Sequence, residues 1–367
     1  MIRQTHWMEI EETERGRYLT GLQSAYGIEI LGEAEDLHAA QQRKYEILRH
    51  RFNARFHPAD GETSREPRRL LISATQRCPF SCAHCWVFGS PSVDCSLSIA
   101  DLESIQRNTS RREPPRWTVS GGEFFVLPHF AEALQRFPID CAFSNGFWGH
   151  PPERCRRWVE RIAAALENNP YTHSTAMTLI LSYDRFHVAG YGTDVPLASA
   201  IANIVAGFYD VLPRVMLRIS HARSNPQDDG YREVIAALNK EGFSTRQTER
   251  QDRNGSIVTI SYQYQRPDSP VRELHVDTYP FSPICRALLI EPRIAPHIHA
   301  ATAGQVGPAR QRYEYAVGPD GGLGLYQILY APPVPYWLGD PVYEPWEKIE
   351  SRLRRDPIAL TLEAEGS

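Results

Sequence analysis

The amino-acid sequence predicts an α/β protein built from parallel βα units. From residue 69 onward, short apolar runs alternate with longer segments in which apolar residues recur at helical spacing. The short runs are apolar through most of their length, which is typical of strands that are covered on both faces. Strands and helices that alternate in this way form either a barrel or a doubly wound sheet.

The apolar runs predict the strands. Buried strands are expected over 70–73, 117–120, 139–143, 177–181 and 215–219. A sixth strand is expected near 274–277, after an inserted polar hairpin around 256–265. The chain therefore supplies five clear βα units and a sixth that the insertion interrupts.

Helices fill the intervals between these strands. Ser98 and Asp101 have the spacing of a capping box, which opens the first helix. Gly242 is the stop signal expected just after the last helix of the series. Three helices with an apolar stripe are expected over 155–166, 197–208 and 231–240.

The chain divides into three parts. Residues 1–68 are rich in charge, include a helical pattern over 35–53 and read as an N-terminal helical appendage. Residues 69–283 hold the βα units, and residues 284–367 form a small C-terminal α+β module. Within that module, a hairpin turn is expected at 319–322 and a short helix near the end of the chain.

Composition limits the classes of function. The 367 residues are 42% hydrophobic and 23% charged, with a formal net charge of -4, as in a soluble globular protein. No run approaches eighteen apolar residues, and the first residues do not form a secretory signal, so we expect a cytoplasmic protein without a membrane partner. The slightly acidic total gives no reason to expect a nucleic-acid partner.

Cysteine usage is uneven. The chain has seven cysteines, too few for a disulfide scaffold at this length. Four of them are dispersed and are expected to be buried structural thiols: Cys95, Cys141, Cys155 and Cys285. The other three form a C-x3-C-x2-C cysteine motif directly after the first strand: Cys78, Cys82 and Cys85.

The spacing of the cysteine motif indicates a metal centre. Such a loop turns three sulfurs toward one point, which suits a metal ion or an iron-sulfur cluster better than a disulfide. One alternative is a zinc site with a distant fourth ligand, and another is an electron-transfer cluster closed by a fourth cysteine such as Cys95. The loop leaves the carboxyl end of a strand, where the chemistry of a βα barrel is found.

The second strand ends in a Gly-Gly-Glu motif formed by Gly121, Gly122 and Glu123. Two glycines at the end of a strand allow a ligand to approach the backbone closely. Three cysteines leave one iron of a four-iron cluster without a protein ligand, so a small molecule can bind there. The two motifs together favour a site that reacts over a purely structural one.

The cysteine motif and the Gly-Gly-Glu motif together resemble those of the radical S-adenosylmethionine superfamily. Ser144 and Asn145, followed by a glycine, are similar to a Thr-Asn-Gly segment that follows the third strand in that family. Ser182 and Asp184 are similar to its Ser-x-Asp segment after the fourth strand. The resemblance covers residues 69–283, with one departure: His84 precedes the third cysteine, where the family usually has an aromatic residue.

The resemblance implies a partial (β/α)6 TIM-like barrel that holds one 4Fe-4S cluster and binds S-adenosylmethionine. The Gly-Gly-Glu motif would receive the methionyl amino group, and Ser144 and Asn145 would belong to the same cofactor site. Ser182 and Asp184 would lie near the ribose. Arg218 would pair with the methionyl carboxylate, or alternatively form a salt bridge that closes the barrel.

The C-terminal module resembles a SPASM or twitch extension that has lost its metal. Residues 280–287 are similar to the segment that follows the sixth strand in such enzymes, with Cys285 where glycine is usual. Residues 317–326 resemble the hairpin that normally carries the first cysteine of an auxiliary cluster, but no cysteine follows Cys285. We therefore expect a lid or a substrate wall without a second cluster.

The resemblance implies an enzyme that cleaves S-adenosylmethionine and removes a hydrogen atom from a substrate carbon, in peptide modification or natural-product biosynthesis. An epimerase, dehydrogenase or mutase acting on a small sugar, nucleoside or amino acid is the alternative. A reducing partner such as flavodoxin or ferredoxin is implied. Asp184 and His187 follow the fourth strand and are the candidate catalytic residues, with His187 as a base on the substrate side. The rival class is a non-catalytic zinc or electron-transfer iron-sulfur protein.

Overall fold

The computed structural model describes residues 69–110, 113–171, 177–192, 195–253, 257–280, 315–325 and 339–353, apart from Trp86, Phe88, Asp94, Pro226 and Asp320. These residues form a mixed α/β structure that divides into two compact units. The expected appendage over 1–68, with its helix, lies outside the described residues, and so does Cys285.

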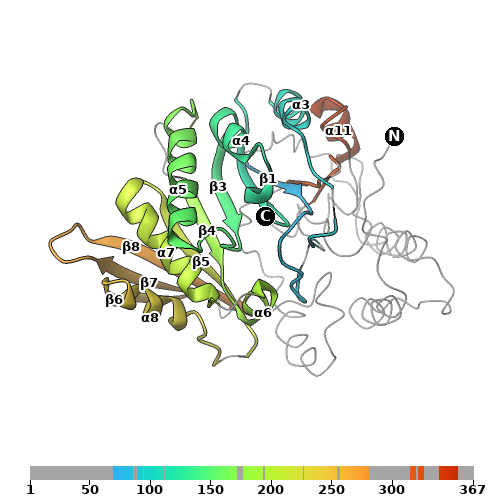
Figure 1. Cartoon of the computed structure of the whole chain (residues 1–367). Helices are drawn as coiled ribbons and strands as arrows, with labels where there is room; N and C mark the ends of the chain where they lie inside the picture. Colours follow the sequence, from blue (N-terminus) through green and yellow to red (C-terminus); the bar gives the residue numbers. More distant parts are fainter. Residues whose placement is uncertain are drawn as a thin grey trace, which may run out of the picture. The chain divides into compact units, whose positions relative to one another are not determined.

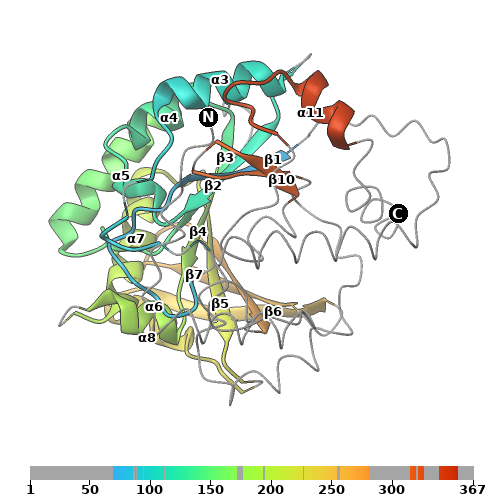
Figure 2. The ribbon, with the colours of Figure 1, turned by 90° about the vertical axis from the view of Figure 1, so that its right-hand side faces the viewer.

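One unit is built on an open sheet, labelled in Figures 1 and 2. Its parallel part has five strands in the order in which they follow along the chain: β2 (Arg116–Gly121), β3 (Ile139–Ser144), β4 (Thr178–Ser182), β5 (Met216–Arg223) and β8 (Arg272–Pro280). Two antiparallel strands extend the sheet beyond β8: β7 (Ile257–Gln265) and then β6 (Ser244–Arg253). No pairing among the described residues joins β6 to β2, so no closed barrel is present there.

Helices cover one face of this sheet (Figure 1). Neighbouring helices pack side by side in the order α4 (Phe130–Arg136), α5 (Pro152–Glu167), α7 (Leu197–Val211) and α8 (Arg232–Lys240). Along β5, Leu217 and Ile219 are buried, whereas Arg218 and Ser220 remain partly exposed. This alternation has the period of two expected for a strand, and it separates an apolar face from a polar one.

Two short elements carry residues of the site. The helix α6 (Arg185–Tyr191) follows β4, and the 3-10 turn η2 (Phe124–Val126) follows β2. Both begin directly after the carboxyl end of a parallel strand. Polar side chains from β2, β3 and β4 are therefore brought to the same edge of the sheet.

The other unit joins the first strand to the C-terminal part of the chain. Strand β9 (Tyr315–Val317) pairs in parallel with β1 (Arg69–Thr75), and β10 (Leu323–Leu325) pairs antiparallel with β9. The ring of Trp346, at the start of α11 (Trp346–Leu353), meets Tyr315 edge to face at 5.3 Å between centroids. Asn108, near the end of α3 (Ile99–Thr109), donates to the carbonyl oxygen of Pro341 at 2.8 Å.

The main sequence-based predictions of secondary structure are confirmed. All six expected strands are present, as β1, β2, β3, β4, β5 and β8. The Ser98–Asp101 capping box opens α3, and the helices expected over 155–166, 197–208 and 231–240 are α5, α7 and α8. The hairpin expected around 256–265 begins earlier, because β6 already pairs with β7 from Ser244.

None of the helices in the described ranges is long and apolar enough to span a membrane.

Candidate functional site

The cysteine motif lies in the loop that follows β1. Gln76, at the start of this loop, is buried and connects its two ends. Its backbone N–H donates to the carbonyl oxygen of Cys95 at 2.9 Å, and its carbonyl oxygen accepts from Ser90 at 3.3 Å. Its side-chain amide donates to the carbonyl oxygen of Val87 at 3.0 Å. The loop is therefore a closed, hydrogen-bonded structure.

Backbone and side-chain N–H groups point at two of the cysteine sulfurs. Sγ of Cys78 accepts from the backbone N–H of Phe80 at 3.4 Å and from Nδ2 of Asn145 at 3.3 Å. Sγ of Cys85 accepts from the backbone N–H of Gly89 at 3.2 Å. Such donors stabilise negative charge on sulfur, and hydrogen bonds to sulfur are one of the ways in which proteins tune iron-sulfur clusters. The surroundings of the Cys78 and Cys85 sulfurs are therefore compatible with thiolate ligands.

Glu123, the last residue of the Gly-Gly-Glu motif, connects the ends of β2 and β3. Its side chain is buried, and Oε1 accepts from the backbone N–H of Phe125 at 3.1 Å. Oε2 accepts from the backbone N–H of Asn145 at 2.7 Å and from the hydroxyl of Ser144 at 3.3 Å. Burial raises the pKa of Glu123 to about 7, although these hydrogen bonds and the nearby His187 act to lower it.

The loop after β3 is held by its own polar side chains. The Ser144 hydroxyl oxygen accepts from the backbone N–H of Gly146 and from the indole N–H of Trp148, both at 3.1 Å. Oδ1 of Asn145 accepts from the backbone N–H of Phe147 at 3.1 Å. Gly146 has a φ of +74°, a conformation that glycine adopts without strain. Ser144 and Asn145 are thus fixed beside Glu123.

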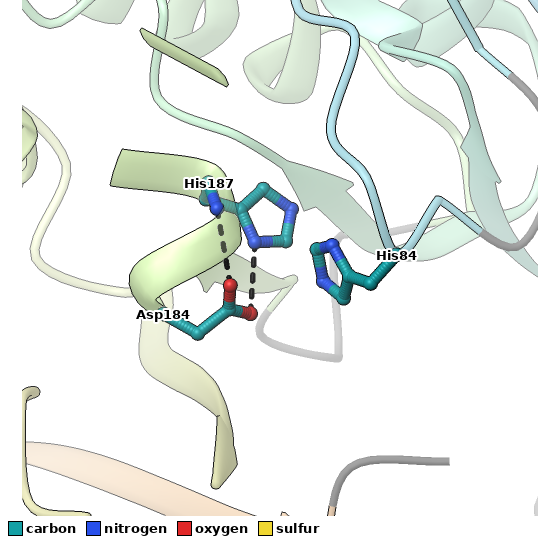
Figure 3. Close-up of side chains that lie close together, drawn as sticks. All are labelled: His84, Asp184 and His187. Carbon is teal, nitrogen blue, oxygen red and sulfur yellow. Dashed lines mark hydrogen bonds and ion pairs between the residues drawn. The ribbon is translucent and has the colours of Figure 1, made fainter. Parts of the chain in front are cut away.

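Asp184 and His187 form a carboxylate–imidazole pair on α6, drawn in Figure 3. Oδ1 of Asp184 caps the helix by accepting from the backbone N–H groups of Phe186 and His187, at 2.9 and 3.1 Å. Oδ2 of Asp184 lies 2.9 Å from Nδ1 of His187. A carboxylate at Nδ1 favours the tautomer that carries its hydrogen there, which leaves Nε2 of the neutral ring as an acceptor. The pair can therefore orient a base.

The same helix contacts the cysteine loop at its other end. A Cβ atom built on Gly190 would lie 2.8 Å from Sγ of Cys82, so the absence of a side chain at Gly190 makes room for this sulfur. The rings of Phe80 and Tyr191 meet edge to face with 5.3 Å between their centroids. Residues 78–82 are therefore positioned by the C-terminal turn of α6.

Arg218 is engaged with the chain itself. Its Nε and Nη2 each donate to one carboxylate oxygen of Asp277 on the neighbouring strand β8, both at 2.7 Å. Thr259 on β7 also donates to Asp277, at 2.7 Å. Arg218 thus forms a salt bridge between neighbouring strands of the open sheet. The expected pair with a methionyl carboxylate stays a prediction. Ser182 lies opposite Ser220 of β5 in the register.

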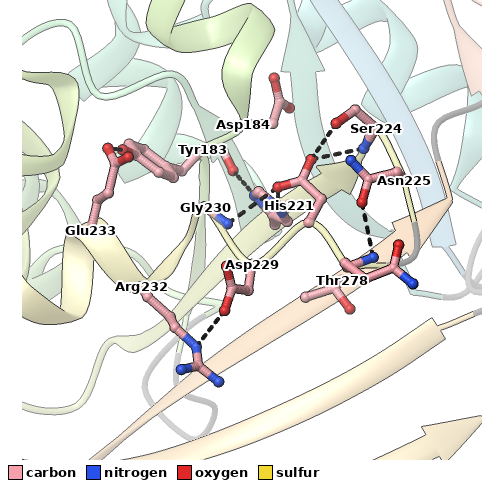
Figure 4. Close-up of polar contacts among 12 residues, drawn as sticks. Tyr183, Asp184, His221, Ser224, Asn225, Asp229, Gly230, Arg232, Glu233 and Thr278 are labelled. Atoms are coloured by element: carbon pink, nitrogen blue, oxygen red, sulfur yellow. Dashed lines mark hydrogen bonds and ion pairs between the residues drawn. The ribbon is translucent and has the colours of Figure 1, made fainter.

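A second polar network, which sequence patterns did not predict, braces the loop after β5 (Figure 4). Nδ1 of the buried His221 lies 2.7 Å from the carbonyl oxygen of Tyr183, and Nε2 lies 3.1 Å from Oδ1 of Asp228. Burial alone would raise the pKa of Asp228, but hydrogen bonds from Ser224 and Gly230 outweigh it, so the pKa is lowered. In the sequence, this role of His221 is indicated only by its alternation with Leu217 and Ile219, which places it on the buried face of β5.

The unit that holds β3, β4 and β5 thus brings several predicted site residues together and leaves others apart. Cys78, Glu123, Ser144 and Asn145 are joined by hydrogen bonds, and Asp184 is joined to His187. Arg218 belongs to a separate network with Asp277. The contact between Asn145 and Cys78 was not foreseen, because these residues are 67 positions apart in the chain.

Comparison with known proteins adds no assignment: no model of a protein family matches the chain, and no curated protein is similar to it at a significant level.

Proposed function

We propose that this protein is a radical S-adenosylmethionine enzyme, in which Cys78, Cys82 and Cys85 hold one 4Fe-4S cluster. The observation that carries this proposal is the set of N–H groups directed at the sulfurs of Cys78 and Cys85 in the loop that follows β1. N–H donors stabilise a thiolate ligand more than a neutral thiol, whose sulfur is only a weak acceptor. The proposed location is the cytoplasm, where three reduced thiols can bind iron.

The arrangement of the strands also supports the proposal. Parallel strands β2, β3, β4, β5 and β8, with helices between them, are the elements that a partial (β/α)6 TIM-like barrel requires. The candidate residues Glu123, Asn145 and Asp184 all follow the carboxyl ends of these strands. In βα barrels this is the end at which active sites are built.

Each group of residues has a role in this proposal. The bound cluster, with S-adenosylmethionine, would supply a 5'-deoxyadenosyl radical that removes a hydrogen atom from a substrate carbon. The partly exposed backbone of Gly121 and Gly122 would receive the methionyl amino group. The Glu123 carboxylate would act mainly by holding Ser144 and Asn145, since both of its oxygens already accept hydrogen bonds within the chain.

The proposed substrate side begins at His187. Its Nδ1 is fixed by Asp184 and its side chain is 18% exposed, so the oriented ring would serve as the base on the substrate side. The proposed substrate is a peptide or a small natural-product precursor, and the electron would come from a flavodoxin- or ferredoxin-like partner. An epimerase, dehydrogenase or mutase on a small polar molecule would use the same pair.

The second candidate function is a zinc or electron-transfer iron-sulfur protein without turnover. It is favoured by the same three thiols, because zinc and iron-sulfur clusters both take thiolate ligands. The two candidate functions are therefore distinguished by the identity of the bound metal and by whether S-adenosylmethionine is cleaved.

The test is purification without oxygen, followed by iron, sulfide and zinc analysis. We expect about four irons and four sulfides per chain, and release of 5'-deoxyadenosine when S-adenosylmethionine and a strong reductant are added. Cys78→Ala should remove both the cluster and the reaction. Cys155→Ala is the matched control, because burial on α5 raises the pKa of Cys155 to about 12 and makes it a poor thiolate. A colourless, zinc-loaded wild type without cleavage would overturn the proposal.

A further inference from the structure

The side-chain amide of Asn145 has a defined orientation. An amide oxygen and nitrogen are assigned from their partners, and here the backbone N–H of Phe147 requires an acceptor. Oδ1 of Asn145 is that acceptor, at 3.1 Å. The NH2 group must then face the other way, where Sγ of Cys78 lies at 3.3 Å.

Asn145 is also held firmly in place. Its backbone N–H donates to Oε2 of Glu123 at 2.7 Å, and its side chain is 6% exposed. Cys78 is equally buried, at 6%. In this setting the N–H···S contact forms away from bulk water, where a hydrogen bond to a charged group is stronger than at the surface.

We propose that Asn145 is a positioning residue that draws electron density from the Cys78 sulfur and thereby makes the metal centre bound there easier to reduce. The inference rests on the proposed function for the identity of that centre. It does not depend on a catalytic role, because the contact joins two residues of the chain. The assignment differs from one in which Asn145 touches S-adenosylmethionine, since the amide is turned toward sulfur.

The physical reason is that reduction adds negative charge to the cluster and its sulfurs. A donor at sulfur stabilises the reduced form more than the oxidised form, so its removal shifts the midpoint potential to more negative values. A hydrogen bond to a charged group typically corresponds to about a tenfold change in an equilibrium constant. For a one-electron step this is about 59 mV.

Two variants separate the donor role from a structural one. Asn145→Ala removes the donor. Asn145→Asp keeps an oxygen that can accept from Phe147 but turns a second oxygen, with negative charge, toward Cys78. The proposal predicts that the midpoint potential falls by about 59 mV in the alanine variant and further in the aspartate variant. A purely structural role predicts that the alanine variant keeps the midpoint potential of the wild type.

The experiment is a redox titration of the anaerobically purified protein, followed by electron paramagnetic resonance. Asn203→Ala is the matched control, because its amide braces the carbonyl oxygen of Gly149 at 3.0 Å and contacts no sulfur in the described structure. Its potential should equal that of the wild type. An Asn145→Asp variant with an unchanged potential would overturn the inference.

A second measurement keeps this inference separate from the proposed function. If the protein takes up no cluster, the same variants are loaded with Co2+ alone and the sulfur-to-cobalt charge-transfer band is recorded. Loss of the donor raises the energy of the sulfur electrons, so the band should move to longer wavelength in Asn145→Ala. A band that stays in place in both Asn145 variants would refute the inference.

Discussion

Glu123 offers the strongest test of the electrostatics of the site. Its carboxylate is buried between the ends of β2 and β3 and accepts hydrogen bonds from Phe125, Ser144 and Asn145. Glu123→Gln keeps the shape of the side chain but removes the group that titrates. The variant therefore isolates the contribution of one carboxyl group to the pH dependence of stability.

The direction and the size of the change in stability with pH follow from the pKa of Glu123. The folded chain holds the proton of Glu123 up to about pH 7, whereas the unfolded chain releases it near the ordinary value of 4.5. Between these values the folded state binds more protons, so the free energy of unfolding decreases as the pH rises. At 1.36 kcal/mol per pKa unit, the wild type should lose about 3 kcal/mol between pH 4.5 and pH 7 relative to Glu123→Gln.

The assay is urea unfolding of metal-free protein at several pH values from 4.5 to 8, in a chelator and a reductant. The other titrating groups are common to both proteins, so they cancel in the difference. Glu160→Gln, an exposed position on α5, is the control and should give a curve parallel to that of the wild type. Parallel curves for the wild type and Glu123→Gln would refute the argument from burial.

Three further predictions concern neighbouring contacts. His187→Ala should leave the metal content and S-adenosylmethionine cleavage intact, but cleavage should no longer lead to product. The measurement is the ratio of 5'-deoxyadenosine to product, and a ratio equal to that of the wild type would make His187 structural. Gly190→Ala should lower the iron content per chain, because its Cβ would lie 2.8 Å from Sγ of Cys82, whereas the exposed neighbour Val188→Ala should not. Arg218→Met should lower the free energy of unfolding in urea by about 2 kcal/mol, because Asp277 loses a bidentate partner. Adding Asp277→Asn should restore part of the lost stability. If the two substitutions instead lower the stability additively, the pairing is contradicted.

The sequence predicts well those helices and strands that bury apolar side chains. Strand β4 is a short continuous apolar run and helix α7 is apolar over most of its length, and both were found. Strand β6 was missed because Ser244–Arg253 is polar on both faces, and its strand conformation depends on pairing with β7. Helix α6 is only seven residues long and starts at the Asp184 cap, so it has too few turns to show a stripe.

In the candidate site, too, the sequence indicates which residues are candidates but not which distant residues they contact. Motif spacing was sufficient to select Cys78, Glu123 and Asn145 as candidates, because each follows a predicted strand. It could not show that Asn145 donates to Cys78, or that Arg218 is paired with Asp277, because both contacts join residues about 60 positions apart. Such pairs depend on the register of neighbouring strands, which the pattern of one strand does not specify.

The parallel pairing of β9 with β1 has a practical consequence for work on shorter forms of the protein. Leu70, Leu71 and Ile72 hydrogen-bond along Tyr315–Val317, so the C-terminal segment completes the sheet beside the first strand. A chain truncated at residue 283 would expose an apolar strand edge there, and exposed edges of this kind template aggregation. Truncation would therefore be expected to yield insoluble material even if every residue of the cysteine motif were retained. Failure of such a fragment to bind iron would say nothing about the cysteines.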